Sequence, residues 1–506
     1  MNRERLRFWL WAAAALLAGL LLRLWFVAHM ARVAGDSLFY GEIAKTWLQH
    51  GVYGVSAASP TGSLVLRPTL ARLPGYPLFL AACFRLFGVE HYRAVLNAQV
   101  VADLVTCWLA GALAGRLFGR RAQMIVLWIA ALCPFTANYV ATALAETLVF
   151  TTIALAFYAF ARWQDAGLGT NRWLWTVAAA LAYSILLRPE QGLLAAAVLP
   201  AMLWRSLATR KPSLRPLRAA LPVLAAAFCV ALPLLFWTAR NERVFHVFQP
   251  LSPRNANDPG DPVVLQGFGR WYRSWAIDFA SVDEVCWPMD GERIEFASLP
   301  PRVFSATSRS TSAEVRNRTA ALIADYNATL ELTPDLDARF DALAAERIHD
   351  QLALYYLGLP IARVFDMALR PRTELMQVSD EWWRWREHRA QSAFAASYAA
   401  LNLAFYVVAF TGFSVWRRRA WLSPNPPAAD PQKVAAPNPP GPGLRATREL
   451  AYAMAASLLL RAAMLLFIDN AEPRYTLEFF PVFFVWIGAL FAEPLLVAPR
   501  KAPREI

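Results

Sequence analysis

Several charged residues of this chain fall at or just beyond the ends of long apolar runs, and the charge pattern places them at one face of a membrane. Carboxylates can act as general bases, and arginine binds anions such as phosphate through a rigid fork of N–H donors. Four carboxylates and four arginines therefore suit an anionic substrate that reacts at the bilayer surface. They are Asp36, Arg67, Arg72, Glu146, Arg188, Glu190, Glu472 and Arg474.

The composition indicates the setting of these residues. Hydrophobic residues make up 57% of the 506, charged residues make up 17%, and the mean hydropathy is +0.33. Soluble domains lack such a composition, so a membrane protein with several spans is predicted. The net charge of +13 comes in short Lys and Arg clusters between apolar runs, as in cytoplasmic loops, so nucleic acid is not expected as a partner. Four of the five cysteines lie in apolar stretches, which does not support a disulfide framework.

The apolar runs predict about ten transmembrane helices in an all-α polytopic protein. With both termini inside, the Lys and Arg clusters fall in the cytoplasmic loops. The run 75–88 is shorter than the ~17–25 residues of a spanning helix. If this run crossed the membrane, the Lys and Arg cluster between 205 and 218 would lie outside. We therefore assign the run 75–88 to a first outer loop, 31–91. The predicted spans cover about 8–29, 94–118, 122–140, 144–162, 173–188, 190–205, 219–239, 392–416, 449–468 and 477–496.

Three regions follow from this topology: a seven-span core over 1–239, an outer, periplasmic domain over 240–390, and three spans over 391–506. Residues 420–447 are rich in proline and are predicted to form a cytoplasmic linker. Amphipathic helices are expected at 36–49, lying on the bilayer, and at 335–352, followed by a half-apolar helix at 353–369. Between 51 and 73 we expect a loop. Trp382, Trp383 and Trp385 are interpreted as interface anchors, with carbohydrate stacking as a second role.

Each candidate residue also has a structural interpretation. Asp36 follows Gly35 and precedes a helix, so it is placed to be an N-cap. Glu146 fits the positive end of a helix dipole, and Arg188 and Arg474 fit interface anchors or salt-bridge partners. Arg23, inside the first apolar run, either snorkels to the interface or meets an anion, and we favour snorkelling. The shared face of the candidates is what favours a site.

The sequence resembles the GT-C glycosyltransferases in particular segments. An Asp just after the first span has a Tyr four residues on, at Asp36 and Tyr40, and is followed by RLPGYPLFLAACFRLFG. This opening is similar to those of protein O-mannosyltransferases and lipid A aminoarabinose transferases. Further matches are ALAET around Glu146, LRPE around Arg188, WTARN before the large loop, and PRY at Pro473-Arg474-Tyr475. The resemblance covers the first 240 residues and about the last 40.

The resemblance implies a GT-C fold and an enzyme of the bacterial inner membrane. It would move a hexosyl or pentosyl group from a polyprenyl-phosphate-linked donor to a lipid, glycan or protein acceptor, at a periplasmic site among membrane lipids. Asp36 would be the base, with Glu146 as a second acid. The family's phosphate-binding Lys corresponds to Leu73, so that role passes to Arg72. Arg67, Arg188, Arg474, Tyr40 and Tyr475 complete the expected lipid-phosphate and donor site.

Two further expectations concern the chemistry. Attack by the acceptor hydroxyl opposite the leaving phosphate should invert the anomeric centre. Some members of this superfamily use a divalent metal ion, for which Asp36 and Glu146 are the oxygen ligands available, but no DxD-type pair or His cluster supports one here. No cofactor is therefore assigned.

Two alternatives stay open. One is a lipid or solute transporter in which the acids and arginines bind a charged cargo. The other is an enzyme of the same fold that ligates or polymerises lipid-linked glycans. No internal repeat is visible, and the large outer domain and the interfacial acidic helix also favour an enzyme over a transporter.

Overall fold

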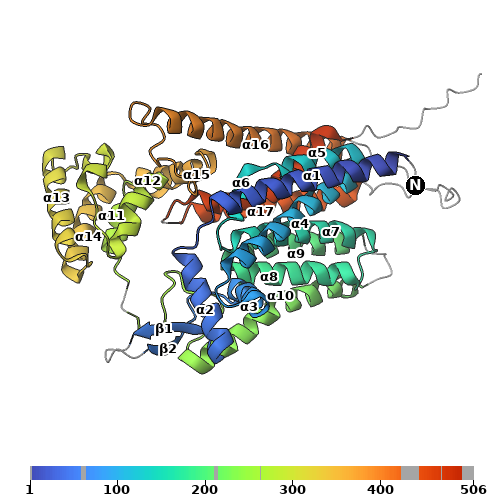
Figure 1. Ribbon diagram of the computed structural model, residues 1–506, viewed down its shortest axis with the longest axis horizontal. Coiled ribbons are helices and arrows are strands. Elements are labelled where there is room, and N and C mark those ends of the chain that lie inside the picture. Colours follow the sequence, from blue (N-terminus) through green and yellow to red (C-terminus); the bar gives the residue numbers. More distant parts are fainter. Residues whose placement is uncertain are drawn as a thin grey trace, which may run out of the picture.

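The computed structural model describes residues 3–58, 64–209, 215–261, 264–422, 444–468 and 470–492. Long helices run side by side in a bundle, and a smaller helical domain lies at the end of the bundle opposite the start of α1 (Figure 1). The mainly helical membrane fold predicted from the sequence is confirmed. Most of the predicted linker, from 423 to 443, lies outside the described residues.

The segment after the first span contains more structure than predicted. Helix α1 (Arg3–His29) leads into α2 (Asp36–His50), which ends at Gly51 in the left-handed conformation as its sequence suggests. The expected loop at 51–73 instead holds an antiparallel hairpin, β1 (Gly54–Ala58) and β2 (Leu64–Pro68). Val55 and Val65 favour strands, a signal that the prediction of a loop did not take into account. Helix α3 (Gly75–Phe87) has 13 residues, in keeping with its exclusion from the spans.

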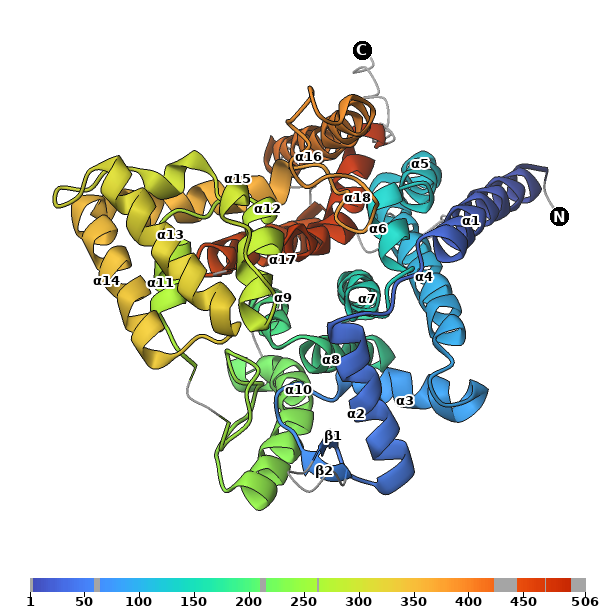
Figure 2. The ribbon, with the colours of Figure 1, turned by 60° about the vertical axis from the view of Figure 1, so that its left-hand side comes forward.

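Seven α-helices follow in the described part of the core before the outer domain. The run 122–140 was predicted as one helix, but it is broken into two. Pro134 lacks an amide N–H and cannot continue the helix that precedes it, so α5 stops and α6 begins at the proline. Helix α7 lies at the centre of the bundle and packs against α4, α8 and α17 (Figure 2). The helices are α4 (Tyr92–Phe118), α5 (Arg120–Ala131), α6 (Pro134–Tyr139), α7 (Glu146–Asp165), α8 (Arg172–Leu187), α9 (Gly192–Ala208) and α10 (Pro216–Phe245).

The outer domain has its own aromatic core, in which Trp271 and Trp275 pack at 5.3 Å and Phe340 closes on Trp271 at 5.0 Å. Thr311 and Glu314 form a capping box that begins α13. The amphipathic helix predicted at 335–352 is confirmed as α14, whereas the helix predicted at 353–369 begins with a wider turn, η6 (Leu354–Gly358). The α-helices are α11 (Gly267–Arg273), α12 (Phe279–Ser281), α13 (Ser312–Thr329), α14 (Pro334–Asp350) and α15 (Leu359–Leu369).

The C-terminal segments return to the bundle. Helices α16 (Arg389–Leu422) and α17 (Leu444–Leu465) precede a tight 3-10 helix, η7 (Pro473–Phe479), which continues into α18 (Phe480–Gly488) and a last turn, η8 (Ala489–Phe491). Gly412 of α16 faces the backbone carbonyl of Trp486, and a Cβ there would clash with it. Close approach of α16 to α18 therefore requires glycine at this position.

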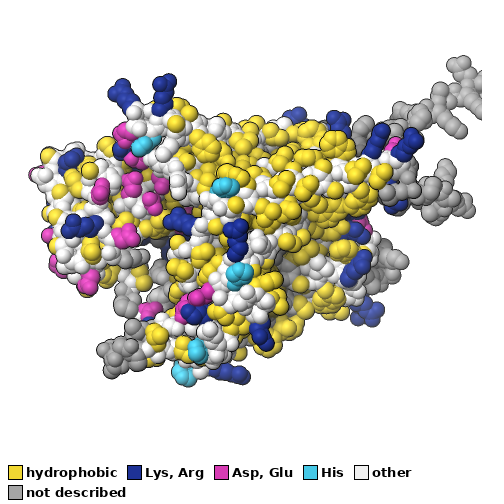
Figure 3. All heavy atoms as spheres, in the orientation of Figure 1, with side chains coloured by type: hydrophobic (Ala, Val, Ile, Leu, Met, Phe, Trp, Pro, Cys, Tyr) yellow, Lys and Arg dark blue, Asp and Glu magenta, His cyan; other side chains and the backbone are white. Residues whose placement is uncertain are grey.

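Six helices in the described part of the chain are long and apolar enough to cross a membrane. They match the spans predicted at 8–29, 94–118, 190–205, 219–239, 392–416 and 477–496. The surface along the bundle is largely apolar in Figure 3, and acidic side chains gather over the outer domain. The total of ten spans stays a prediction, because α8 has 16 residues, α5 is short, and α7 and α17 are not among the six.

Arg23 does not snorkel. Its side chain is fully buried, its Nε donates to Asp103 of α4 at 2.7 Å, and its Nη1 donates to the carbonyl of Ala131 at 2.7 Å. The prediction of snorkelling was wrong because Asp103, eighty residues away in sequence, supplies an anion inside the bundle. The alternative that Arg23 meets an anion is the correct one.

Candidate active site

Asp36 is the first residue of α2, yet its side chain makes no capping hydrogen bond, so the N-cap interpretation does not hold. Gly35 precedes it with φ of 53°, a conformation that glycine adopts without strain and that turns the chain between α1 and α2. The carboxylate accepts from Arg72 Nη2 at 2.9 Å and from Arg474 Nη2 at 3.4 Å. It is 35% exposed and therefore accessible while paired.

Arg72 comes from the stretch between β2 and α3. Its guanidinium packs over the rings of Phe39 and Tyr40, at 5.5 and 5.8 Å from their centroids, which fixes its orientation toward Asp36. Leu73, beside it, is 3% exposed and belongs to the core. A phosphate-binding side chain in this stretch can therefore come from Arg72 and not from Leu73.

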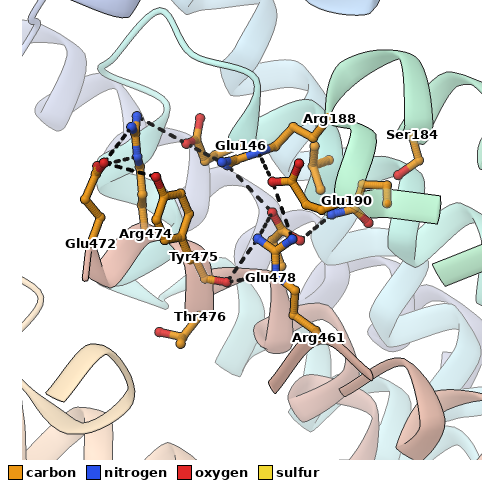
Figure 4. Close-up of polar contacts among 12 residues, drawn as sticks. Glu146, Ser184, Arg188, Glu190, Arg461, Glu472, Arg474, Tyr475, Thr476 and Glu478 are labelled. Carbon is orange, nitrogen blue, oxygen red and sulfur yellow. Dashed lines mark hydrogen bonds and ion pairs between the residues drawn. The ribbon is translucent and has the colours of Figure 1, made fainter. Parts of the chain in front are cut away.

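Arg474 connects three carboxylates from distant parts of the chain. It lies on η7, and its Nε is 2.5 Å from Glu472, its Nη2 is 3.4 Å from Asp36, and its Nη1 is 3.7 Å from Glu146. Tyr475 lies beneath it, with the guanidinium 5.5 Å from the ring, and donates its hydroxyl to Glu472 at 3.1 Å (Figure 4). The guanidinium is therefore held in place from several sides.

Behind Arg474 the network of ion pairs continues into the bundle (Figure 4). Glu146, the first residue of α7, is 3% exposed and accepts from Arg188 at 2.9 Å. Arg188 also donates to Glu190 at 2.8 Å, and Arg461 joins Glu190 at 3.4 Å and Glu478 at 2.9 Å. This deeper part is enclosed, so it supports the residues in front of it.

Arg461 and Glu478 were not among the site residues predicted from the sequence. Both lie within apolar runs predicted to span the membrane, at 449–468 and 477–496. A charged residue inside a spanning segment is rare and usually functional, so their position was the signal that could have identified them.

The pKa shifts of Asp36 and Glu472, the two acids beside Arg474, have opposite directions. Burial acts to raise the pKa of Asp36, but Arg474 and Arg72 outweigh it and hold this pKa below its ordinary value. Burial raises the pKa of Glu472, although Arg474 opposes this. Asp36 is therefore ionised at neutral pH.

A cleft of about 860 Å³ opens beside Asp36 and Arg474, between the bundle and the outer domain. Its walls come from five separate stretches of chain. The bundle contributes Arg32, Ala34, Gly35, Asp36, Tyr139, Thr142, Leu144, Glu472, Pro473 and Arg474. The outer domain and the segment after α15 contribute Phe279, Asp283, Trp287, Glu292, Glu374, Leu375, Met376 and Asp380. The volume suits a small organic ligand.

The predicted site residues come together with one exception. Asp36, Arg72, Glu146, Arg188 and Arg474 form the network of ion pairs, while Tyr40 and Tyr475 pack against its arginines. Arg67 lies on β2, is 46% exposed and pairs with Asp261 instead. The hairpin carries it away from Asp36, which the sequence did not reveal.

Asp36 and Glu146 are poorly arranged to share a metal ion, because the cationic guanidinium of Arg474 contacts both carboxylates. Among the described residues, no group of three or more His, Cys, Asp or Glu side chains has the arrangement of a metal site. The donors present fit an anion better than a cation, so no catalytic step is assigned to a metal.

Residues 68–237 match the family model described as dolichyl-phosphate-mannose-protein mannosyltransferase. The matched segment runs from the end of β2 into α10 and includes Arg72, Glu146 and Arg188. No curated protein matches the chain significantly. Over this matched segment, about a third of the chain, the protein is similar to that family, in agreement with the predicted resemblance to integral membrane glycosyltransferases of the GT-C class.

Solved structures of this class also match the chain. ArnT from Cupriavidus metallidurans in the apo state is 16% identical, with a TM-score of 0.35 over 93% of this chain and 78% of that one. The same protein bound to undecaprenyl phosphate is 15% identical, with a TM-score of 0.36 over 95% of this chain and 77% of that one. A third match is archaeal oligosaccharyltransferase AglB from Archaeoglobus fulgidus in complex with an inhibitory peptide and a dolichol-phosphate. It is 11% identical, with a TM-score of 0.46 over 95% of this chain and 50% of that one. These distant likenesses assign no residue role in this chain.

Proposed function

We propose that this protein transfers a sugar from a polyprenyl-phosphate-linked donor to a hydroxyl group of an acceptor, at the outer face of a bacterial inner membrane. The observation that carries the proposal is the Asp36 carboxylate held between Arg72 and Arg474 at the wall of the cleft. One side chain can accept a proton there, and its two partners can bind a phosphate. The family match to enzymes named for a dolichyl-phosphate sugar donor supports the same chemistry.

Asp36 is the proposed general base. While paired with two arginines it is ionised but weakly basic, because both guanidiniums stabilise its charge. A donor phosphate that enters the cleft competes for these guanidiniums. As Arg72 or Arg474 turns to the phosphate, the carboxylate loses a partner and becomes a stronger base for the acceptor hydroxyl.

Arg72 and Arg474 are the proposed donor-phosphate ligands. When the bond from the anomeric carbon to the phosphate oxygen breaks, negative charge grows on the leaving polyprenyl phosphate, and guanidiniums already aimed at it lower the barrier. Tyr40 and Tyr475 hold the planes of these arginines. Glu146 and Arg188 act from behind by fixing Arg474, a positioning role that suits their burial better than direct proton transfer.

The reaction balances with these groups alone. The acceptor oxygen forms a bond to the anomeric carbon, the phosphate oxygen leaves with the bonding electrons, and Asp36 takes the hydroxyl proton. Attack from the face opposite the phosphate inverts the anomeric configuration. NMR of the product linkage should therefore show the anomer opposite to that of the donor, and retention would contradict this step.

The decisive experiment compares two carboxylates of similar setting. Full-length protein in detergent is incubated with polyprenyl-phosphate sugars and envelope extract from the producing cell, and released polyprenyl phosphate is measured by mass spectrometry. Asp36→Asn should lower the rate ~10²–10⁴-fold, the usual contribution of a general base. Asp261→Asn is the matched control, because Asp261 pairs with Arg67 as Asp36 pairs with Arg72. It should retain the wild-type rate.

Each other outcome has a definite meaning. Full activity of Asp36→Asn rejects this residue as the base. No release of polyprenyl phosphate by the wild type, together with ion-coupled movement of a charged cargo into proteoliposomes, would favour the transporter alternative. Products that contain several transferred units would favour the polymerase alternative.

A further inference from the structure

The wall of the cleft that the outer domain forms presents an exposed indole. Trp287 begins η3 (Trp287–Asp290), directly after the wide helical turn η2 (Val282–Cys286). Its side chain is 44% exposed although it lines the cleft. Phe279, which is 5% exposed, supports it in an edge-to-face contact at 5.4 Å. The buried ring therefore holds the exposed ring in place.

Two carboxylates flank this indole along the same wall. Asp283 and Glu292 also line the cleft and are exposed, and within the described residues neither side chain has a hydrogen bond or an ion pair, although the charge of Arg32, which also lines the cleft, acts on Asp283. Ionised carboxylates only accept hydrogen bonds, so a ligand on this wall must donate them. The opposite wall presents Arg474 beside Asp36, which suits the phosphate end of a substrate.

An apolar platform between hydrogen-bond acceptors has a specific chemical counterpart. One face of a pyranose ring carries C–H groups that pack on an indole, while its rim carries hydroxyl or amino groups that donate to carboxylates. A flexible peptide does not present a face of C–H groups with a rim of hydrogen-bond donors in such a regular arrangement. Other exposed tryptophans do not offer this combination, since Trp383 is also 44% exposed but is not part of the cleft.

We propose that Trp287, Asp283 and Glu292 form an acceptor subsite that binds a neutral or amine-bearing saccharide. This inference rests on the proposed function and names the acceptor class for it. With the donor phosphate on the arginines of one wall, a saccharide on Trp287 would have its hydroxyl groups in the cleft that contains Asp36.

Saturation-transfer NMR on the full-length protein in detergent tests the subsite without turnover. The probes are methyl β-glucoside, methyl β-glucosaminide, methyl β-glucuronide and a short Ser/Thr-containing peptide. Ring protons of the glucoside and glucosaminide should receive saturation from the wild type. The signal should fall about fivefold in Trp287→Ala, persist in Trp287→Phe, and be unchanged in the matched control Trp383→Ala.

The charged probe tests the carboxylates separately. The anionic glucuronide should give less signal than the glucoside in the wild type, and the double variant Asp283→Asn/Glu292→Gln should remove this difference. Undecaprenyl phosphate should leave the glucoside signal in place because it takes the opposite wall. Displacement by this lipid would instead assign the platform to the donor and overturn the acceptor subsite.

The remaining outcomes also overturn the proposal: no glycoside signal from the wild type, an equal signal from Trp287→Ala, or a stronger signal from the peptide. The inactive variant Asp36→Asn separates the two proposals. If it binds glycoside normally while the wild type transfers nothing, the subsite stands and the proposed function falls.

Discussion

Two arginine–aspartate pairs in this protein have the same chemistry and different surroundings. Arg23 and Asp103 are 0% and 1% exposed, and backbone carbonyls of the bundle take further N–H groups of Arg23. Arg72 and Asp36 are 25% and 35% exposed and lie where the bundle meets the outer domain. The enclosed pair has no competitor for its partners, whereas the open pair can exchange a partner for a substrate.

The comparison shows that burial decides what an ion pair contributes. Charges removed from water are costly unless they stay paired, so the enclosed pair fixes the packing of α1, α4 and α5. A partly exposed pair adds little to stability but holds an ionised carboxylate and oriented guanidiniums ready for a ligand. One pair should therefore affect folding and the other should affect the rate.

Breaking the enclosed pair should have the largest effect on stability. Arg23→Met leaves Asp103 charged and unpaired in the bundle and should lower the free energy of unfolding by about 3–5 kcal/mol. Thermal unfolding in detergent measures this loss. The double variant Arg23→Met/Asp103→Leu should recover most of it, with the rate per folded molecule unchanged. A normal melting temperature for the single variant would show that the pair does not hold the bundle.

Breaking the open network should lower the rate instead. Arg474→Lys keeps the charge but loses the fork that spans Asp36, Glu146 and Glu472, and kcat should fall ~10²–10³-fold with little change in melting temperature. Arg461→Lys is the control, because the carboxylates that pair with Arg461 are Glu190 and Glu478 at the enclosed end of the network, and it should have a smaller effect. Equal losses from both variants would mean that the network acts as one structural unit.

A carboxylate with mostly acidic neighbours gives the third case. Burial and the neighbouring Glu381, Asp283 and Asp380 raise the pKa of Glu284 to about 7. The folded state then binds a proton that the unfolded state has lost above about pH 4.3, so stability falls as pH rises from about 4.3 to 7 and levels off above that. Glu284→Gln should raise the melting temperature at about pH 8 and leave it nearly unchanged at about pH 4. A gain confined to the acidic sample would contradict this sign.

The smallest effect is expected at the most exposed pair. Arg67, joined to Asp261 on the hairpin, is outside the network, and exposed pairs contribute about 0–1 kcal/mol. Arg67→Ala should change the transfer rate less than about twofold. A larger loss would return Arg67 to the donor site that its sequence position first suggested.

Much of the site could be predicted because topology brings the ends of spans to one face. Asp36, Glu146, Arg188 and Arg474 were placed together on charge alone, and the structure joins them by ion pairs. The same argument failed for Arg67, since a face does not specify which side chains meet and the hairpin was not predicted.

The outer wall of the cleft could not be predicted. Trp287 and Asp283 belong to short irregular turns with no periodic pattern, and they reach the site only through the packing of the outer domain on the bundle. The partner of Arg23 could not be predicted either. Tertiary packing brings Asp103 to it, whereas the prediction used only the distance of Arg23 from the membrane surface.

Arg474 lies on η7, near the end of the described chain, and completes a network that begins at Asp36 on α2. During synthesis the ribosome produces Asp36 and Arg72 long before this residue exists. A nascent chain that stops before η7 therefore has the proposed base without the second guanidinium. Under the proposed function, the donor-phosphate site is complete only once η7 has been made and has packed against the start of α2.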